Sequence, residues 1–71
     1  MGGCGMRLTD LWQRLEETFG PAYAASVAHD QVLPELGGRT IDQALADGED
    51  AATVWRGVVE AYPERVPARI R

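Results

Sequence analysis

Glycine and proline interrupt the helical pattern of this chain repeatedly, so that only short helices are possible. Between these residues, apolar side chains recur at helical spacing, and no segment shows the alternation typical of a strand. The interruptions lie at Gly20-Pro21, Pro34, Gly37-Gly38, Gly48 and Pro63. A chain of 71 residues has room for one domain. The sequence therefore predicts an all-α fold, a compact small bundle of four helices in an orthogonal or antiparallel arrangement.

Two helices are predicted on either side of Gly20-Pro21. The first is expected from Asp10 to Phe19, with Thr9 or Asp10 as its N-cap and Gly20 as a left-handed stop. Its predicted inward stripe is Leu8, Leu11, Trp12, Leu15 and Phe19. The second is expected from Pro21, a favoured first-turn residue, to Gln31 or Val32. Its predicted inward face is Tyr23, Ala24, Val27 and Ala28.

The second half of the chain predicts a turn and two more helices. Residues 33–36 are expected to form a single turn, followed by a chain reversal at Gly37-Gly38. Thr40 and Gln43 have the spacing of a capping box, so the third helix should begin at Ile41 and end at Gly48. The fourth helix should run from an Asp50 cap to about Tyr62.

These elements divide the chain into three parts. Residues 6–63 are predicted to form the helical domain. Residues 64–71 are expected to be an arginine-containing C-terminal tail, loose or turn-forming, with Arg65, Arg69 and Arg71. Residues 1–5, which precede a second methionine, are interpreted as a disordered extension, a tag remnant or an alternative start.

Composition limits the partners that we expect. The net charge is −4, and the seven basic residues are all arginines. A protein that coats nucleic acid is usually basic, so DNA is disfavoured as a partner although a local site is possible. No apolar run has the length of a membrane helix. Cys4 is the single cysteine, which allows no internal disulfide and indicates a reducing cytoplasm. We expect no cofactor and no metal.

Neither the histidine nor the acidic clusters predict catalysis. His29, the only histidine, should point to solvent on the second helix. Its neighbour Asp30 cannot face it, because adjacent helix residues diverge. Asp47, Glu49 and Asp50 do not match a calcium loop and are expected to be solvated helix ends. Asp47 at a helix C-terminus is mildly unfavourable, and nothing in the sequence explains it. The sequence therefore predicts that the protein is not an enzyme.

Trp12 and Trp55 are predicted to anchor the core. If their indole N–H groups reach the surface, they could also mark a partner-binding patch, because tryptophan combines a large apolar body with a polar atom. A core of this size is thin, so the sequence leaves open a monomer or a weak homodimer formed through either residue.

Several short strings from Met6 onward together form a characteristic pattern: Met6-Arg7-Leu8-Thr9, the Trp12 helix, Phe19-Gly20, Tyr23-Ala24, Leu33, Leu36-Gly37-Gly38-Arg39-Thr40, Ala44-Leu45, Gly48 and Val54-Trp55-Arg56. In these residues the chain resembles a family of small actinobacterial proteins of unknown function, the DUF3046 family. Gly57-Val58-Val59 departs from it, since the family suggests an alanine and often a cysteine there. The family implies no enzymatic activity. Its members tend to be encoded near genes of the recombination machinery.

A second, local resemblance covers Leu33–Ile41, which is similar to the turn of helix-hairpin-helix DNA-binding motifs. In those motifs a glycine-rich turn offers backbone N–H groups to a phosphate, and the next helix adds its positive N-terminal end. Gly37 matches the second glycine of the motif, and Thr40 and Ile41 match its helix start. Glu35 replaces the first glycine and adds a negative charge where phosphate would approach.

The sequence favours a non-catalytic protein–protein interaction module over the alternative, weak sequence-independent DNA-backbone binding linked to recombination or repair. The expected contact surface is the corner formed by Gly37, Gly38, Arg39 and Thr40, with Arg56 nearby. Arg39 and Arg56 could each cap a carbonyl, pair with a local acid or contact a protein partner. Sequence alone does not identify that partner.

Overall fold

The computed structural model describes residues 6–70, and they form an all-α domain with four α-helices, as the sequence predicts. The helices are α1 (Leu8–Phe19), α2 (Pro21–Asp30), α3 (Ile41–Ala46) and α4 (Ala51–Ala61), with 3₁₀ turns η2 (Pro34–Leu36) and η3 (Ala68–Ile70). The extension predicted for residues 1–5, with Cys4, lies outside the described residues, as does Arg71.

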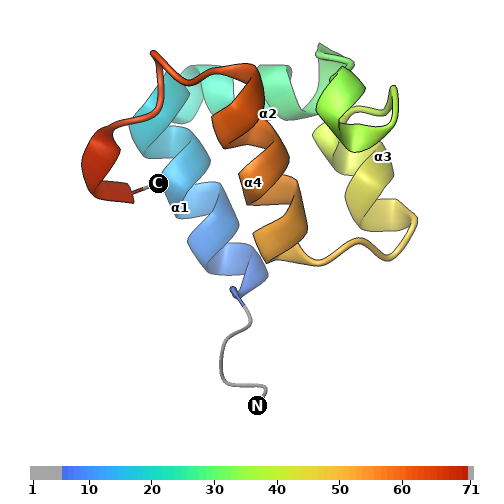
Figure 1. Cartoon of the computed structure of the whole chain (residues 1–71). Helices are drawn as coiled ribbons and strands as arrows, with labels where there is room; N and C mark the ends of the chain where they lie inside the picture. Colours follow the sequence, from blue (N-terminus) through green and yellow to red (C-terminus); the bar gives the residue numbers. More distant parts are fainter. Residues whose placement is uncertain (1–5, 71) are drawn as a thin grey trace.

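Figure 1 shows how the four helices are arranged. Helices α1 and α4 lie side by side and run in the same direction. Helix α2 crosses behind their carboxyl ends, and α3 runs back in the opposite direction to α4. The last residues return from the end of α4 to α1. The hairpin between α2 and α3 is thereby placed at one corner of the molecule. Between Met6 and Ile70, no helix combines the length and apolar character needed to cross a bilayer.

One core receives side chains from every helix. Its buried residues are Leu11, Leu15, Phe19, Ala24, Ala28, Leu33, Leu36, Ile41, Ala44, Val54, Trp55, Val58 and Val66. Trp55 is a core residue, as predicted, whereas Trp12 is only half-buried at the edge of the core. The small pair Ala24 and Ala28, four residues apart on one face of α2, lets this helix approach its neighbours closely.

Two predicted core residues are instead exposed. Tyr23 is 65% exposed, because the inward face of α2 centres on Ala24 and Ala28 and leaves Tyr23 on its flank. Leu8 is 51% exposed, at the beginning of α1. Helix α1 begins two residues earlier than predicted, with Arg7 as N-cap and without a side-chain cap. Thr9 and Asp10 therefore lie in its first turn rather than at its cap.

The predicted turns are present with the expected glycines. Gly20 ends α1 with φ of +93° and donates its N–H to the Glu16 carbonyl at 2.8 Å. At α3, both halves of the capping box form: Gln43 N–H donates to Thr40 Oγ1 at 3.1 Å, and Thr40 N–H donates to Gln43 Oε1 at 3.0 Å. Asp50 is the N-cap of α4, but its side chain forms no capping hydrogen bond.

The C-terminal segment packs against the helices. Val66 is 2% exposed and belongs to the core. The Ile70 carbonyl accepts hydrogen bonds from Trp55 Nε1 at 3.0 Å and from Arg14 Nη1 at 3.4 Å. Arg69 pairs with Glu17 at 2.6 Å. Residues 64–70 therefore form turns, which is one of the two alternatives predicted for them, and they are not a loose tail. They pack as part of the helical domain, which was expected to end at residue 63.

Candidate functional site

The chain reverses between α2 and α3 through a closed hairpin. Leu33 and Arg39 form an isolated antiparallel bridge, in which Leu33 N–H donates to the Arg39 carbonyl at 3.0 Å. Gly37 and Gly38 adopt φ of +72° and +78°, a region that disfavours other residues. Both glycines are exposed, whereas Thr40 is buried. The chain therefore reverses at Gly37-Gly38 as predicted. Because both residues lack a side chain, the exposed edge of the turn consists of backbone atoms.

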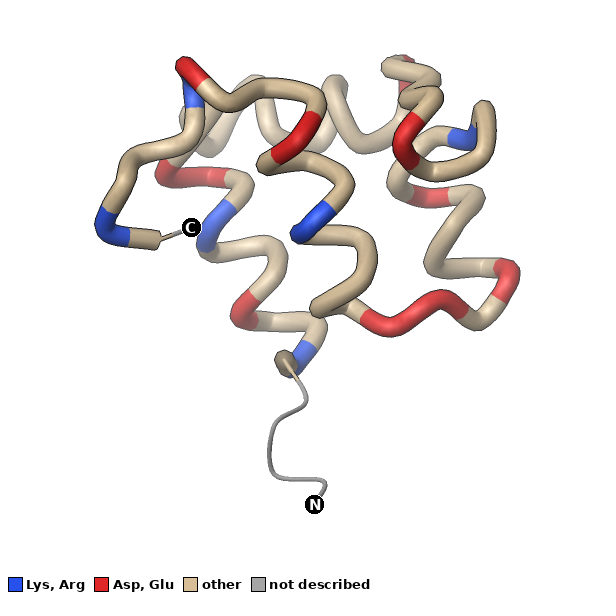
Figure 2. Tube along the Cα trace, viewed as in Figure 1, with Lys and Arg blue, Asp and Glu red and all other residues tan. Residues whose placement is uncertain are grey.

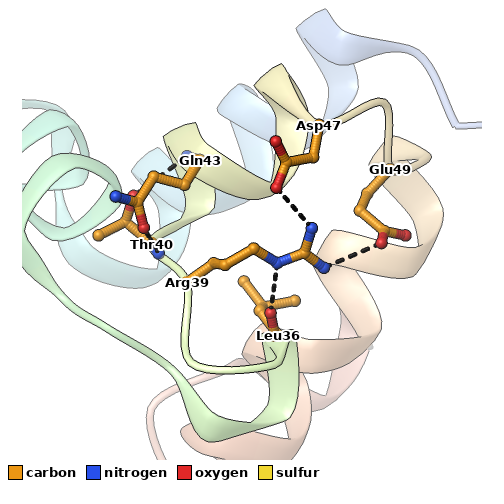
Figure 3. A network of polar contacts seen from close by, with 6 residues as sticks. All are labelled: Leu36, Arg39, Thr40, Gln43, Asp47 and Glu49. Atoms are coloured by element: carbon orange, nitrogen blue, oxygen red, sulfur yellow. Dashed lines mark hydrogen bonds and ion pairs between the residues drawn. The ribbon is translucent and has the colours of Figure 1, made fainter.

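Arg39 is the centre of this corner (Figure 3). Its Nε donates to the Leu36 carbonyl at 2.7 Å, and its two terminal nitrogens reach Asp47 at 2.9 Å and Glu49 at 2.9 Å. One guanidinium therefore joins the hairpin, the C-terminal end of α3 and the loop before α4. We call this group of four residues, Leu36, Arg39, Asp47 and Glu49, the arginine clamp.

The clamp also explains the charge of Asp47. A carboxylate at the C-terminus of α3 faces the negative end of the helix dipole, and Arg39 compensates this charge. The hydrogen bond to Glu49 is the main reason why the pKa of Arg39 is raised, and the bond to Asp47 comes second. Desolvation opposes both. The side chains of Asp47 and Glu49 were predicted to be solvated. They are 59% and 37% exposed, and in addition both bind Arg39.

The hairpin uses internally the backbone donors that a DNA-binding hairpin would present. Leu36, Gly37 and Gly38 donate their N–H groups to the Leu33 or Pro34 carbonyl at 2.9–3.1 Å. Thr40 N–H is held by the capping box, and α3 is only six residues long. A phosphate approaching here would also meet Glu35, which is exposed. The N–H groups of this corner thus stabilise the hairpin itself.

Arg56 does not line this corner. It is exposed on α4, and its side chain lines a separate cleft with Arg14 of α1. The next residue, Gly57, does face the hairpin, because it packs against Leu36. Of the residues predicted as one site, the structure therefore groups Gly37, Gly38, Arg39 and Thr40 and assigns Arg56 to another surface.

His29 has a carboxylate partner that sequence reasoning missed. Its Nδ1 lies 3.3 Å from Asp42 Oδ2 on α3, and no hydrogen bond or ion pair joins it to Asp30 within residues 6–70. Ser26, His29 and Asp42 line one open groove of about 480 Å³. No hydrogen bond joins Ser26 to His29 among the described residues, and the His29 side chain is 78% exposed. Neither burial nor a second contact positions this histidine as a base.

A further groove lies where α2, the end of α1 and the end of α4 meet. It has a volume of about 510 Å³ and is lined by Phe19, Tyr23, Ser26, Val27, Asp30, Gln31, Tyr62 and Arg65. The rings of Phe19 and Tyr62 meet edge to face, with centroids 5.2 Å apart, and the Arg65 guanidinium lies 5.4 Å from the Phe19 centroid. We call it the tyrosine groove.

Sequence reasoning did not select the tyrosine groove, because its residues come from three distant segments. Tyr23 was expected in the core, and Arg65 in a tail. One signal was available: the alanines of α2 leave Tyr23 as its single aromatic residue, beside rather than on the alanine face. Among residues 6–70, no three His, Cys, Asp or Glu side chains are grouped to hold a metal ion.

These features define a small all-α domain with an internally bonded hairpin and surface grooves between its helices. The chain belongs to the DUF3046 family, described as proteins of unknown function, whose model matches residues 6–69. This confirms the resemblance that the Leu-Gly-Gly-Arg-Thr and Val-Trp-Arg strings indicate. No curated protein and no solved structure matches the chain.

Proposed function

We propose that this domain is a non-catalytic protein-interaction module and that its partner binds in the tyrosine groove. The observation that carries the proposal is the combination of Tyr23, Tyr62 and Arg65 around one groove. Tyrosine and arginine are enriched among the residues that dominate binding energy at interfaces. Tyr23 is mostly exposed in the isolated chain, so it offers a large apolar surface for a partner to cover.

The groove is also pre-arranged. The contacts of Phe19 with Tyr62 and with Arg65 hold its wall in place before any partner binds. A fixed wall lowers the conformational entropy that association would otherwise cost. The wall is attached to the core through Phe19 and Val66, both of which are buried. These properties favour a segment of folded protein or an extended peptide as the occupant.

The alternative, DNA-backbone binding through the hairpin, has less support. The N–H groups of Gly37 and Gly38 are occupied within the hairpin, and Arg39 is held by two carboxylates. Arg65 and Arg69 of the C-terminal segment contact Phe19 and Glu17. The observations therefore favour protein over DNA as the partner.

The test compares two variants that each remove an exposed apolar side chain. Tyr23→Ala alters the tyrosine groove, and Leu8→Ala alters the start of α1, which lies outside it. Both variants and the wild-type chain are used as bait in extracts of the source cells. We expect a protein that is retained by wild type and by Leu8→Ala but lost from Tyr23→Ala. Equal retention by all three baits would contradict the proposed surface.

A further inference from the structure

A cleft between α1 and α4 brings two arginines together over an apolar floor. It has a volume of about 260 Å³ and is lined by Met6, Arg14, Ala52, Trp55, Arg56 and Val59. Two of these six residues are cationic and none is acidic. Figure 2 shows the basic position of α1 and that of α4 on the two adjacent helices. We call it the arginine cleft; no residue lines both it and the tyrosine groove.

Arg14 is held at the edge of this cleft. Its guanidinium carbon lies 5.9 Å from the centroid of the Trp55 ring, and its Nη1 donates to the Ile70 carbonyl at 3.4 Å. Trp55 Nε1 donates to the same carbonyl, so the indole that supports Arg14 is itself fixed. A guanidinium carries five N–H donors. Most of the donors of Arg14 therefore remain available to a ligand at a fixed position.

Arg56, in contrast to Arg14, is not held by other residues of the described chain. Within residues 6–70 it forms no ion pair or hydrogen bond, whereas Arg39 and Arg69 each bind carboxylates. Asp10, Glu17 and Glu60 are the acidic residues one turn away on the same helices. Glu17 pairs with Arg69, and none of the three lines the cleft. In a chain of net charge −4, the arginine cleft is thus a local site of uncompensated positive charge.

We propose that the arginine cleft binds an acidic segment of a partner protein. A side-chain carboxylate lies between Arg14 and Arg56, since guanidinium groups bind carboxylates through paired hydrogen bonds. An apolar side chain of the same segment covers Ala52 and Val59 on the floor. The apolar floor favours a peptide over an inorganic anion or a phosphate backbone. Residues 1–5 of the chain contain no side-chain carboxylate, so they do not have this chemistry.

The probe is a short synthetic peptide in which aspartate and glutamate alternate with leucine, titrated into the ¹⁵N-labelled chain. A second peptide with asparagine and glutamine in place of the acids is the matched control. We expect the acidic peptide alone to shift the Trp55 indole N–H and the Ala52, Arg56 and Val59 amides. Arg56→Gln should weaken its binding about tenfold, the effect of one lost charge-assisted hydrogen bond.

Arg65→Gln removes the same charge from the tyrosine groove and should leave peptide binding unchanged. Arg65 lies in the tyrosine groove and not in the arginine cleft. A negative result with the acidic peptide would therefore contradict the arginine cleft alone, and the proposed function would still be tested by the Tyr23→Ala variant. Arg56 is exposed and forms no hydrogen bond or ion pair with other described residues, so its replacement should preserve the dispersed spectrum of the fold. Equal binding of both peptides, or no shift at the cleft, would overturn the proposal. So would shifts at the cleft with inorganic phosphate or duplex DNA in place of the acidic peptide.

Discussion

Gly57 of α4 lies against Leu36 of the hairpin so closely that an added Cβ would stand 2.6 Å from Leu36 Cδ2. The family resemblance suggests an alanine in the segment Gly57-Val58-Val59, where this chain has none. The absence of a side chain lets α4 approach η2, and Leu36 fills the space. The same Leu36 offers its carbonyl to Arg39, so helix packing and the arginine clamp meet at one residue.

Gly57→Ala should therefore destabilise the domain. Alanine in a helix interior gains roughly 1 kcal/mol over glycine, but overpacking a core costs about 1–3 kcal/mol. We expect a net loss of about 1 kcal/mol in the free energy of unfolding, measured by urea denaturation. In a Leu36→Val background, which removes the δ-methyl groups, the same substitution should be neutral or stabilising. A stabilising effect of Gly57→Ala in the wild-type background would refute this contact.

Thr40→Ala should destabilise the domain, because it removes the N-cap side chain of α3. The Thr40 hydroxyl is buried and accepts the Gln43 N–H. The loss of an N-cap side chain costs about 1 kcal/mol in the free energy of unfolding. Thr9→Ala is the matched control, because Thr9 lies in the first turn of α1 rather than at its cap. It should change stability by less than about 0.5 kcal/mol. An equal loss in both variants would restore Thr9 as a cap.

Arg39→Ala should lower the urea midpoint, because it removes three hydrogen bonds and leaves the Asp47 charge uncompensated. Arg56→Ala removes the same charge where there is no such bond, and should leave the midpoint nearly unchanged. The pKa of Arg39 is raised in the folded state. Its stabilising contribution is thus present below the ordinary arginine pKa and is lost only in strong alkali. The difference between the two variants should therefore be constant across neutral pH.

Val66→Ala should destabilise the domain by about 2 kcal/mol, the value for removing two buried methylene equivalents. Arg69→Gln, which removes only an exposed ion pair, should have little effect. Urea denaturation followed by tryptophan fluorescence reports both, because the indole of Trp55, one of the two tryptophans, is bonded to the same segment. If Val66→Ala had no effect, the C-terminal segment would be a tail after all.

A short DNA duplex added at low salt should leave the amide signals of Gly37, Gly38 and Thr40 in place. Their N–H groups already have partners within the chain. Shifts confined to these residues that disappear at high salt would instead support the phosphate-binding alternative, because phosphate contacts weaken steeply with salt.

The local elements could be predicted because their causes are local. Gly20-Pro21, the glycine reversal and the Thr40–Gln43 capping box each act within a few residues. The acceptors of Arg39 could not be predicted, because Asp47 and Glu49 reach it only once α3 folds back. The partner of Arg14 is still more remote: 56 residues separate it from Ile70. Sequence periodicity shows which face of a helix is apolar, but it does not show which distant residues meet. For the same reason, the tyrosine groove and the arginine cleft could not be predicted.

The most direct measurement of the central claim is photo-crosslinking in the source cells from two positions. A photoreactive phenylalanine analogue replaces Tyr23 in the tyrosine groove or Glu35 in the exposed hairpin, and both side chains are exposed. We expect a protein to be crosslinked from position 23 that is absent from position 35. Crosslinking from position 35, with none from position 23, would contradict the claim and return the interaction site to the hairpin corner.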